Sequence, residues 1–220
     1  SMAVPPWAFA VGIAALRKVG MRGVVVKGWS SFSKEALKEG VDQLETDQQG
    51  RDEILAFARE NVLILDKAPH EWLFRQCSCT VHHGGAGTTA AALRAGVPTI
   101  IVPLGYDQTY HGDWVESLGV GVKCRTVFEV DVAEFENALR RTTSEPEMHA
   151  KSREVAETLR QEPGVAGAVA QIRSVICEDV RSGKAKQRWQ AEEGARKERE
   201  LKRMSIPSKT KTSQSKTAGT

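Results

Sequence analysis

The sequence lacks the marks of membrane-spanning, exported and disulfide-bonded proteins. Its 220 residues contain no apolar run near the 18 residues of a membrane-spanning helix, and no basic and apolar leader pattern opens it. Cysteine is scarce, and the four thiols lack the paired spacing of a zinc site. We therefore expect a cytoplasmic protein with free thiols at Cys77, Cys79, Cys124 and Cys177.

The excess of basic residues is confined to the end of the sequence. Residues 181–220 carry a net charge of +8, whereas residues 1–180 carry −5. The basic segment has few large apolar residues besides Trp189. We therefore expect a domain over residues 1–180 and a largely disordered tail over 181–220, which includes a solvated helix around residues 184–202. A solvated tail is the simplest interpretation. Weak contact with an anionic membrane surface is the functional alternative, and nucleic acid is not expected as a partner.

Short runs of Val, Ile and Leu alternate with helical patterns up to residue 131. Strands are expected near residues 24–27, 61–66, 79–82, 99–102 and 120–122. This alternation predicts an α/β fold, a Rossmann-like parallel sheet with helices on both faces, followed by C-terminal helices. The first helix, from Pro5 to Gly20, has no strand pattern before it, so we expect the first strand of the sheet to be missing from this sequence. The polar stretch 33–60 is expected as two amphipathic helices that form an insertion or a long connection on the surface. Trp72 and Trp114 are expected in the core.

The glycine-rich segment 82–88 concentrates the chemistry of the chain. Its glycines permit tight turns with positive φ, and the run from Thr88 to Ala95 has high helix propensity before Gly96 and Pro98 end it. A glycine turn that leads into a helix presents unpaired N–H groups and the positive end of the helix dipole, which favours a phosphate. The glycine spacing alone leaves a purely structural turn equally plausible.

The adjacent histidines do not indicate a metal. Neighbouring residues of a strand point to opposite faces, so His82 and His83 cannot easily share one ion. We expect His82 to be structural and His83 to donate a ring N–H to a phosphate oxygen. No metal or cofactor is expected.

Several motifs together resemble a known family, the nucleotide-sugar glycosyltransferases of GT-B fold, in particular the fungal type of UDP-glucose:sterol 3-β-glucosyltransferase. The motifs are residues 1–2, 28–30, 68–74, 82–89, 93–98 and 107–108. The resemblance spans about residues 1–180 and covers the donor-binding half of a GT-B enzyme. Lys67 and Ala91 depart from plant-type relatives, which place a uracil-stacking Trp and a ribose-binding Glu there, and both departures suit the sterol and bacterial branch.

The resemblance implies a set of substrate-binding residues for UDP-glucose. The Ala68 backbone and His70 would hold the uracil and ribose, and Asp107 and Gln108 would bind the sugar hydroxyls. The diphosphate would lie on His83, Ala86, Gly87 and Thr88.

The resemblance also implies glucose transfer to a sterol 3-hydroxyl with inversion. In this family the acceptor half and the catalytic base precede the donor half, so we expect this chain to bind the donor and to be inactive alone, with no catalytic residue of its own. Another hydrophobic aglycone as acceptor, or a non-catalytic UDP-sugar-binding module, are the alternatives. A lipid acceptor would suit a location at the periphery of membranes.

Overall fold

The computed structural model describes residues 4–27 and 32–204, so the motifs at 1–2 and 28–30 lie outside the described residues. The chain forms two compact units, of which the first extends to Glu162 and the second begins at Pro163. The sequence placed this boundary near residue 180. No helix among the described residues is both long enough and apolar enough to cross a membrane.

All five expected strands form, and all pair in parallel. They are β1 (Gly23–Val26), β2 (Val62–Leu65), β3 (Thr80–His82), β4 (Thr99–Ile101) and β5 (Gly121–Lys123). They build two sheets, β1-β2 and β3-β4-β5, where the sequence predicted one. The predicted α/β fold of parallel strands covered by helices is confirmed, although no described strand joins β1 to β3 into one continuous sheet.

Helix α1 (Pro6–Val19) packs against both sheets. It starts at a proline, whose fixed φ suits the first helical position, and it ends at Gly20 with a left-handed φ of 69°. Val11 and Ala15 of α1 belong to the core above β4 and β5, whereas Phe9 and Ile13 belong to the core beside β1 and β2. One helix therefore holds the two sheets together through side-chain packing.

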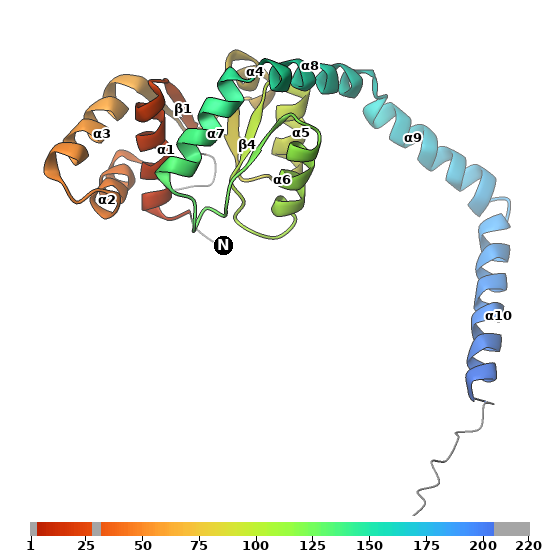
Figure 1. Cartoon of the computed structure of the whole chain (residues 1–220). Coiled ribbons are helices and arrows are strands. Elements are labelled where there is room, and N and C mark those ends of the chain that lie inside the picture. The colour runs from red at the N-terminus through yellow and green to blue at the C-terminus, as the bar shows by residue number, and fades with distance from the viewer. Residues whose placement is uncertain (1–3, 28–31, 205–220) are drawn as a thin grey trace, which may run out of the picture. The chain divides into compact units, whose positions relative to one another are not determined.

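The polar stretch 33–60 forms the crossover from β1 to β2. It contains α2 (Lys34–Leu44) and α3 (Gln48–Asn61), whose first turns are capped by the side chains of Ser33 and Asp47. Their apolar faces are buried against α1 through Leu37, Val41, Ile54 and Ala58. In Figure 1 these three helices lie side by side. The segment is thus a long connection between the two strands, and its apolar faces also contribute to the first core.

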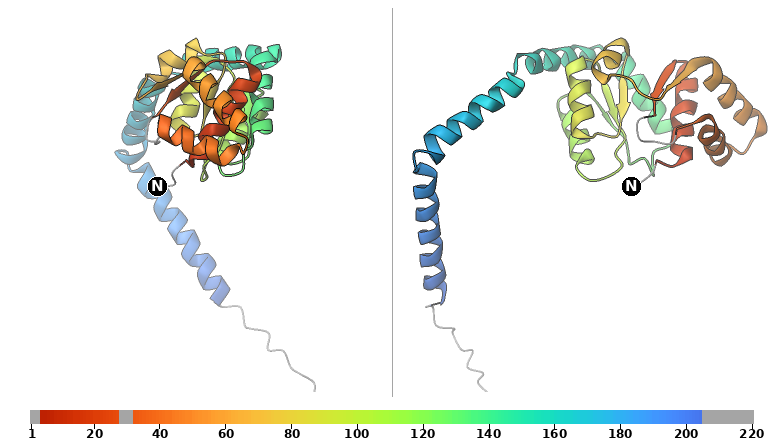
Figure 2. Two further views of the ribbon diagram at one scale, coloured as in Figure 1. Left: turned by 90° about the vertical axis from the view of Figure 1, so that its left-hand side faces the viewer. Right: turned by 180° about the vertical axis from the view of Figure 1, so that it is seen from behind.

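The second sheet is covered on both faces. Ile100 of β4 points into the core shared with α1 and α7 (Val132–Ser144), whereas its neighbour Ile101 points to Val115 on the opposite face. That opposite face is covered by α5 (Ala86–Ala95) and α6 (Gln108–Ser117). Figure 2 shows α5 beside the strands from behind, and α8 (Pro146–Gln161) packs against α5.

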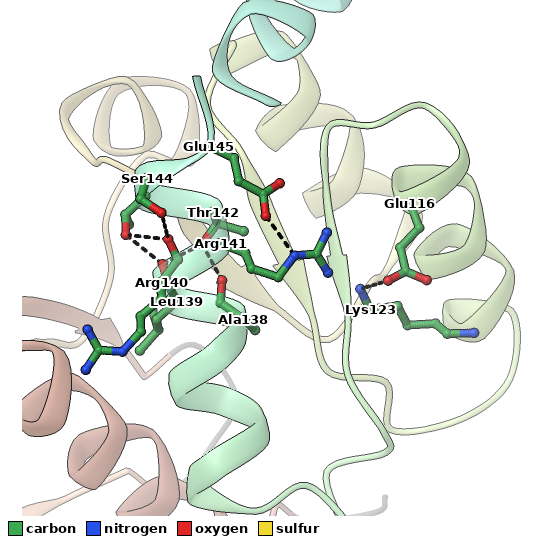
Figure 3. Close-up of polar contacts among 10 residues, drawn as sticks. Glu116, Lys123, Ala138, Leu139, Arg140, Arg141, Thr142, Ser144 and Glu145 are labelled. Atoms are coloured by element: carbon green, nitrogen blue, oxygen red, sulfur yellow. Dashed lines mark hydrogen bonds and ion pairs between the residues drawn. The ribbon is translucent and has the colours of Figure 1, made fainter. Parts of the chain in front are cut away.

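The last turn of α7 is fixed by hydroxyl groups and ion pairs. Figure 3 shows the buried Thr142 donating to the Ala138 carbonyl (2.8 Å), with Arg141 paired to Glu145 at 2.9 Å. Beside it, the Glu116 carboxylate accepts the Lys123 N–H (3.1 Å) and ties α6 to β5. A cavity of about 490 Å³ lies here, but none of the predicted site residues lines it.

The described part of the second unit consists of helices joined by a turn at residues 181–183. It contains α9 (Gly164–Ser174), a π-helical turn (Val175–Val180) and α10 (Lys184–Met204). Pairs such as Lys197–Glu193 and Arg188–Asp179 (2.9 Å) connect its charged side chains. Helix α10 coincides with the solvated helix expected around residues 184–202, and residues 205–220 lie outside the described part of the chain.

Two tryptophans expected in the core are exposed. The side chains of Trp72 and Trp114 are both 64% accessible. Trp72 stands on the one-turn helix α4 (His70–Leu73), which buries Leu73 instead, and Trp114 precedes Val115, the residue of α6 that is fully buried. Each short helix buries only one side, so the adjacent tryptophan faces outward.

Candidate functional site

The carboxyl ends of β3 and β4 bring the two polar loops of the second sheet together. His82 lies opposite Ile101 in the parallel pairing, so the turn that follows β3 and the loop 104–108 that follows β4 leave the same edge. Gly84 makes this approach close: a Cβ there would lie 2.8 Å from Ile101 Cγ2 and 3.0 Å from the Gln108 carbonyl oxygen, and its φ is +91°. Only glycine suits both the backbone conformation and the space.

The glycine turn ends in an uncapped helix N-terminus. Gly85 is the N-cap residue of α5 and provides no side chain, so the N–H groups of Ala86, Gly87 and Thr88, the first three of the helix, have no capping side chain. The Gly85 carbonyl accepts from the Thr89 N–H (2.9 Å), which begins the helical ladder. Three N–H groups and the helix dipole therefore converge on the space before α5, where an anion is favoured.

His82 is a structural histidine, as its sequence position predicted. Its Nδ1 accepts the Gly84 N–H (3.1 Å), and its Nε2 lies 2.9 Å from Thr99 Oγ1. The first bond requires a bare Nδ1, so the ring is neutral with its proton on Nε2. Burial, together with the nearby His83 and His70, lowers the pKa of His82 to about 3.

The His83 ring lies over the backbone of the glycine turn. A Cβ added to Gly85 would collide with its Nε2, so the imidazole covers the backbone just before α5. The residue is exposed, yet partial burial of the ring lowers its pKa, against the opposing effect of the Asp107 carboxylate. A neutral His83 at pH 7 still offers one ring N–H to a ligand oxygen.

The loop after β4 presents the Asp107 carboxylate and the amide NH₂ group of Gln108. Gln108 Oε1 accepts the N–H groups of Leu104 (2.7 Å) and Gly105 (3.2 Å), so only its amide NH₂ remains to donate to a ligand. The exposed Asp107 carboxylate does not cap α6. Between them and the strand, Tyr106 has a φ of +59°, which is uncommon for a residue with a side chain. The loop thus offers a carboxylate acceptor beside an amide donor.

Ala68 and His70 come from the other sheet, after β2. Ala68 is half-buried, and the exposed His70 ring stacks on Phe74 with ring centres 4.8 Å apart. Helix α4, which begins at His70, packs against α5, the helix that follows the glycine turn. The segment therefore borders the glycine turn. Among the described residues, no group of three or more His, Cys, Asp and Glu side chains could hold a metal ion.

One residue of this region was missed by the sequence interpretation. His111, in the first turn of α6, places its Nδ1 2.7 Å from the Gly84 carbonyl oxygen. The only sequence signal is its spacing, three residues after Gln108, which puts the two on one side of the helix.

The amino-acid sequence is similar to a known domain family and to known glycosyltransferases. Residues 41–175 match the model of the erythromycin biosynthesis protein CIII-like C-terminal domain. A sterol 3-beta-glucosyltransferase of Sclerotinia sclerotiorum is 38% identical over 160 residues, which is 73% of this chain and 10% of that protein. The sterol 3-beta-glucosyltransferase UGT80B1 of Arabidopsis thaliana is 36% identical over 157 residues, 71% of this chain and 22% of that protein.

Solved glycosyltransferases share the fold. The glycosyltransferase VinC, in complex with DTDP, aligns with a TM-score of 0.57 and 24% identity over 76% of this chain and 37% of VinC. The calicheamicin glycosyltransferase CalG4 aligns with a TM-score of 0.61 and 18% identity over 80% of this chain and 41% of CalG4. The described chain thus has the fold of one half of a GT-B glycosyltransferase, and it spans only about a tenth to a fifth of the two sterol enzymes compared above.

Proposed function

We propose that the chain is the donor-binding half of a UDP-glucose-dependent sterol glucosyltransferase. The premise is that the chain belongs to the family of erythromycin biosynthesis protein CIII-like C-terminal domains, and that its curated relatives include sterol glucosyltransferases. The observation that carries the proposal is the uncapped start of α5, with His83 over it and Asp107 across from it. An anion and a polyhydroxyl group are the two chemistries that this arrangement accommodates.

The proposed donor pose follows the two loops. The diphosphate binds the N–H groups of Ala86, Gly87 and Thr88 and one ring N–H of His83. The sugar hydroxyls donate to the Asp107 carboxylate and accept from the Gln108 amide, whose oxygen is already engaged by the loop. Ala68 and His70, after β2, hold the nucleoside.

The chemical role of this half is to stabilise the leaving group. As the bond between the anomeric carbon and the diphosphate breaks, negative charge grows on the phosphate oxygens, and the helix dipole with the N–H donors favours that charge. Transfer with inversion also needs a base to deprotonate the acceptor hydroxyl, and we assign that base to another part of the whole enzyme. The chain alone should bind the donor without transferring glucose.

The sterol acceptor rests on the two relatives named above, at 36–38% identity. No described residue of the donor loops contacts an acceptor in this scheme. Another hydrophobic aglycone is therefore the competing acceptor, and a UDP-sugar-binding module without activity is the competing function.

Calorimetric titration of UDP and UDP-glucose into the full chain tests the proposal. We expect saturable binding of both, and a loss of about tenfold to a hundredfold in affinity for His83→Ala, because hydrogen bonds to charged groups contribute about 1.5–3 kcal/mol. His149→Ala, on α8, is the matched control and should bind as the parent does. No heat with either nucleotide would contradict the donor site, and unchanged binding by His83→Ala would contradict the role of His83.

A further inference from the structure

The peptide groups of Gly84 are held by two imidazoles from different elements. The Gly84 N–H donates to Nδ1 of His82 on β3, at 3.1 Å, and the Gly84 carbonyl lies 2.7 Å from Nδ1 of His111 on α6. An N–H group can only donate and a carbonyl can only accept, so the two rings must be opposite tautomers: Nδ1 is bare in His82 and protonated in His111. Each ring thus fixes one side of the same residue.

The bond from His111 connects the two loops of the candidate site. Gly84 precedes the N-cap of α5, whereas His111 follows Asp107 and Gln108 by one helical turn. No other hydrogen bond between described residues joins the backbone of the glycine turn to a side chain of α6. Because Gly84 has a φ of +91° and packs against Ile101 and Gln108, a small rotation of its carbonyl would redirect the N–H groups that follow.

We propose that His111 is a positioning residue for the nucleotide-sugar site: through the Gly84 carbonyl, it holds the diphosphate-binding turn at a fixed orientation relative to Asp107 and Gln108. It acts through Gly84 and does not touch the ligand. The expected effect of His111 on nucleotide binding rests on the proposed donor function. Its effect on the orientation of the turn rests only on the hydrogen bond to Gly84.

A pair of substitutions separates the hydrogen bond from the bulk of the ring. His111→Leu fills similar space but cannot donate, whereas the amide nitrogen of His111→Asn can donate from near the position of Nδ1. In the full chain, we expect His111→Leu to bind UDP about tenfold more weakly, since one hydrogen bond contributes about 1 kcal/mol or slightly more, and His111→Asn to stay within about threefold of the parent. Trp114→Leu removes the aromatic neighbour of His111, 5.5 Å away, and should leave UDP affinity unchanged.

Amide NMR spectra of the ligand-free chain provide the readout that does not depend on the nucleotide. In His111→Leu, the resonances of Gly85, Gly87 and Thr88 should shift, while in His111→Asn and Trp114→Leu they should stay near their parent positions. Unchanged spectra for His111→Leu would overturn the positioning role, as would parental UDP affinity in that variant. Shifted spectra in a chain that binds no UDP would instead refute the donor function and retain the effect of His111 on the turn.

Discussion

Acidification from pH 7 to pH 5 should destabilise the first unit through His82. The folded protein lowers the pKa of His82 to about 3, whereas in the unfolded chain the pKa has its ordinary value of 6.5. Below pH 6.5 the unfolded chain therefore binds a proton that the folded protein excludes, and the stabilising contribution is lost as the pH falls from 6.5 towards 3. At 1.36 kcal/mol per pH unit, the loss between pH 6.5 and pH 5 is about 2 kcal/mol.

The structure identifies what protonation would break. A proton on Nδ1 of His82 would replace the acceptor that the Gly84 N–H now uses, and the imidazolium would be buried beside Thr99. His82→Asn removes the titrating group but keeps an oxygen that can accept from Gly84. Its stability should be lower than that of the parent at pH 7, and it should lack the contribution of His82 to the pH dependence.

Urea unfolding at pH 7 and pH 5 measures the difference. The parent should lose about 2 kcal/mol more than His82→Asn over this range, because all other ionisable groups are the same in both proteins and their contributions cancel. Equal losses in the two proteins would refute the argument that His82 stays neutral in the folded state.

Three further predictions concern backbone and thiol positions. Gly84→Ala should lower the unfolding free energy by about 2 kcal/mol or more in urea titrations. Gly12→Ala in α1, where a methyl group meets nothing within 4 Å, should raise the unfolding free energy by about 0.5–1 kcal/mol. Equal effects of the two substitutions would contradict the constraint at Gly84. Asp131→Ala removes the N-cap of α7 and should cost about 1 kcal/mol in the same assay, and no change would argue against the cap. The exposed Cys177 should react first with a thiol reagent at pH 8, while Cys124, whose pKa burial raises to about 12, should react only on unfolding; early loss of Cys124 by mass spectrometry would contradict its burial.

The local elements could be predicted from the sequence because their signals are local. Pro6 and Gly20 mark the ends of α1, and the apolar runs coincide with all five strands. The opposite directions of His82 and His83 follow from strand alternation. The separation into two sheets could not be predicted, since hydrogen bonding between strands depends on which edges meet.

The candidate site could be predicted only in part, because some of its contacts join residues that are distant in the sequence. The glycine turn and the loop at Asp107 stand out as residue types, but the capture of Gln108 Oε1 by two backbone N–H groups depends on the path of the loop. The contact of His111 with Gly84 joins residues 27 positions apart and leaves no local pattern. The exposed Trp72 and Trp114 show that an aromatic residue in a short helix does not determine which side of the helix is buried.

The division into two sheets has a consequence for hydrogen exchange and self-association. The Lys27 N–H donates to β2, and the Thr80 N–H donates to the loop before β4. Alternate residues of a parallel strand direct their main-chain groups to opposite edges, so Val24 and Val26 of β1 and Val81 of β3 face the unpaired edges of their strands. The described residues provide these groups with no main-chain partner. Their amides should exchange with solvent far sooner than those of Ile100 at the centre of the second sheet, and open parallel edges with exposed valines can recruit strands from other molecules at high concentration.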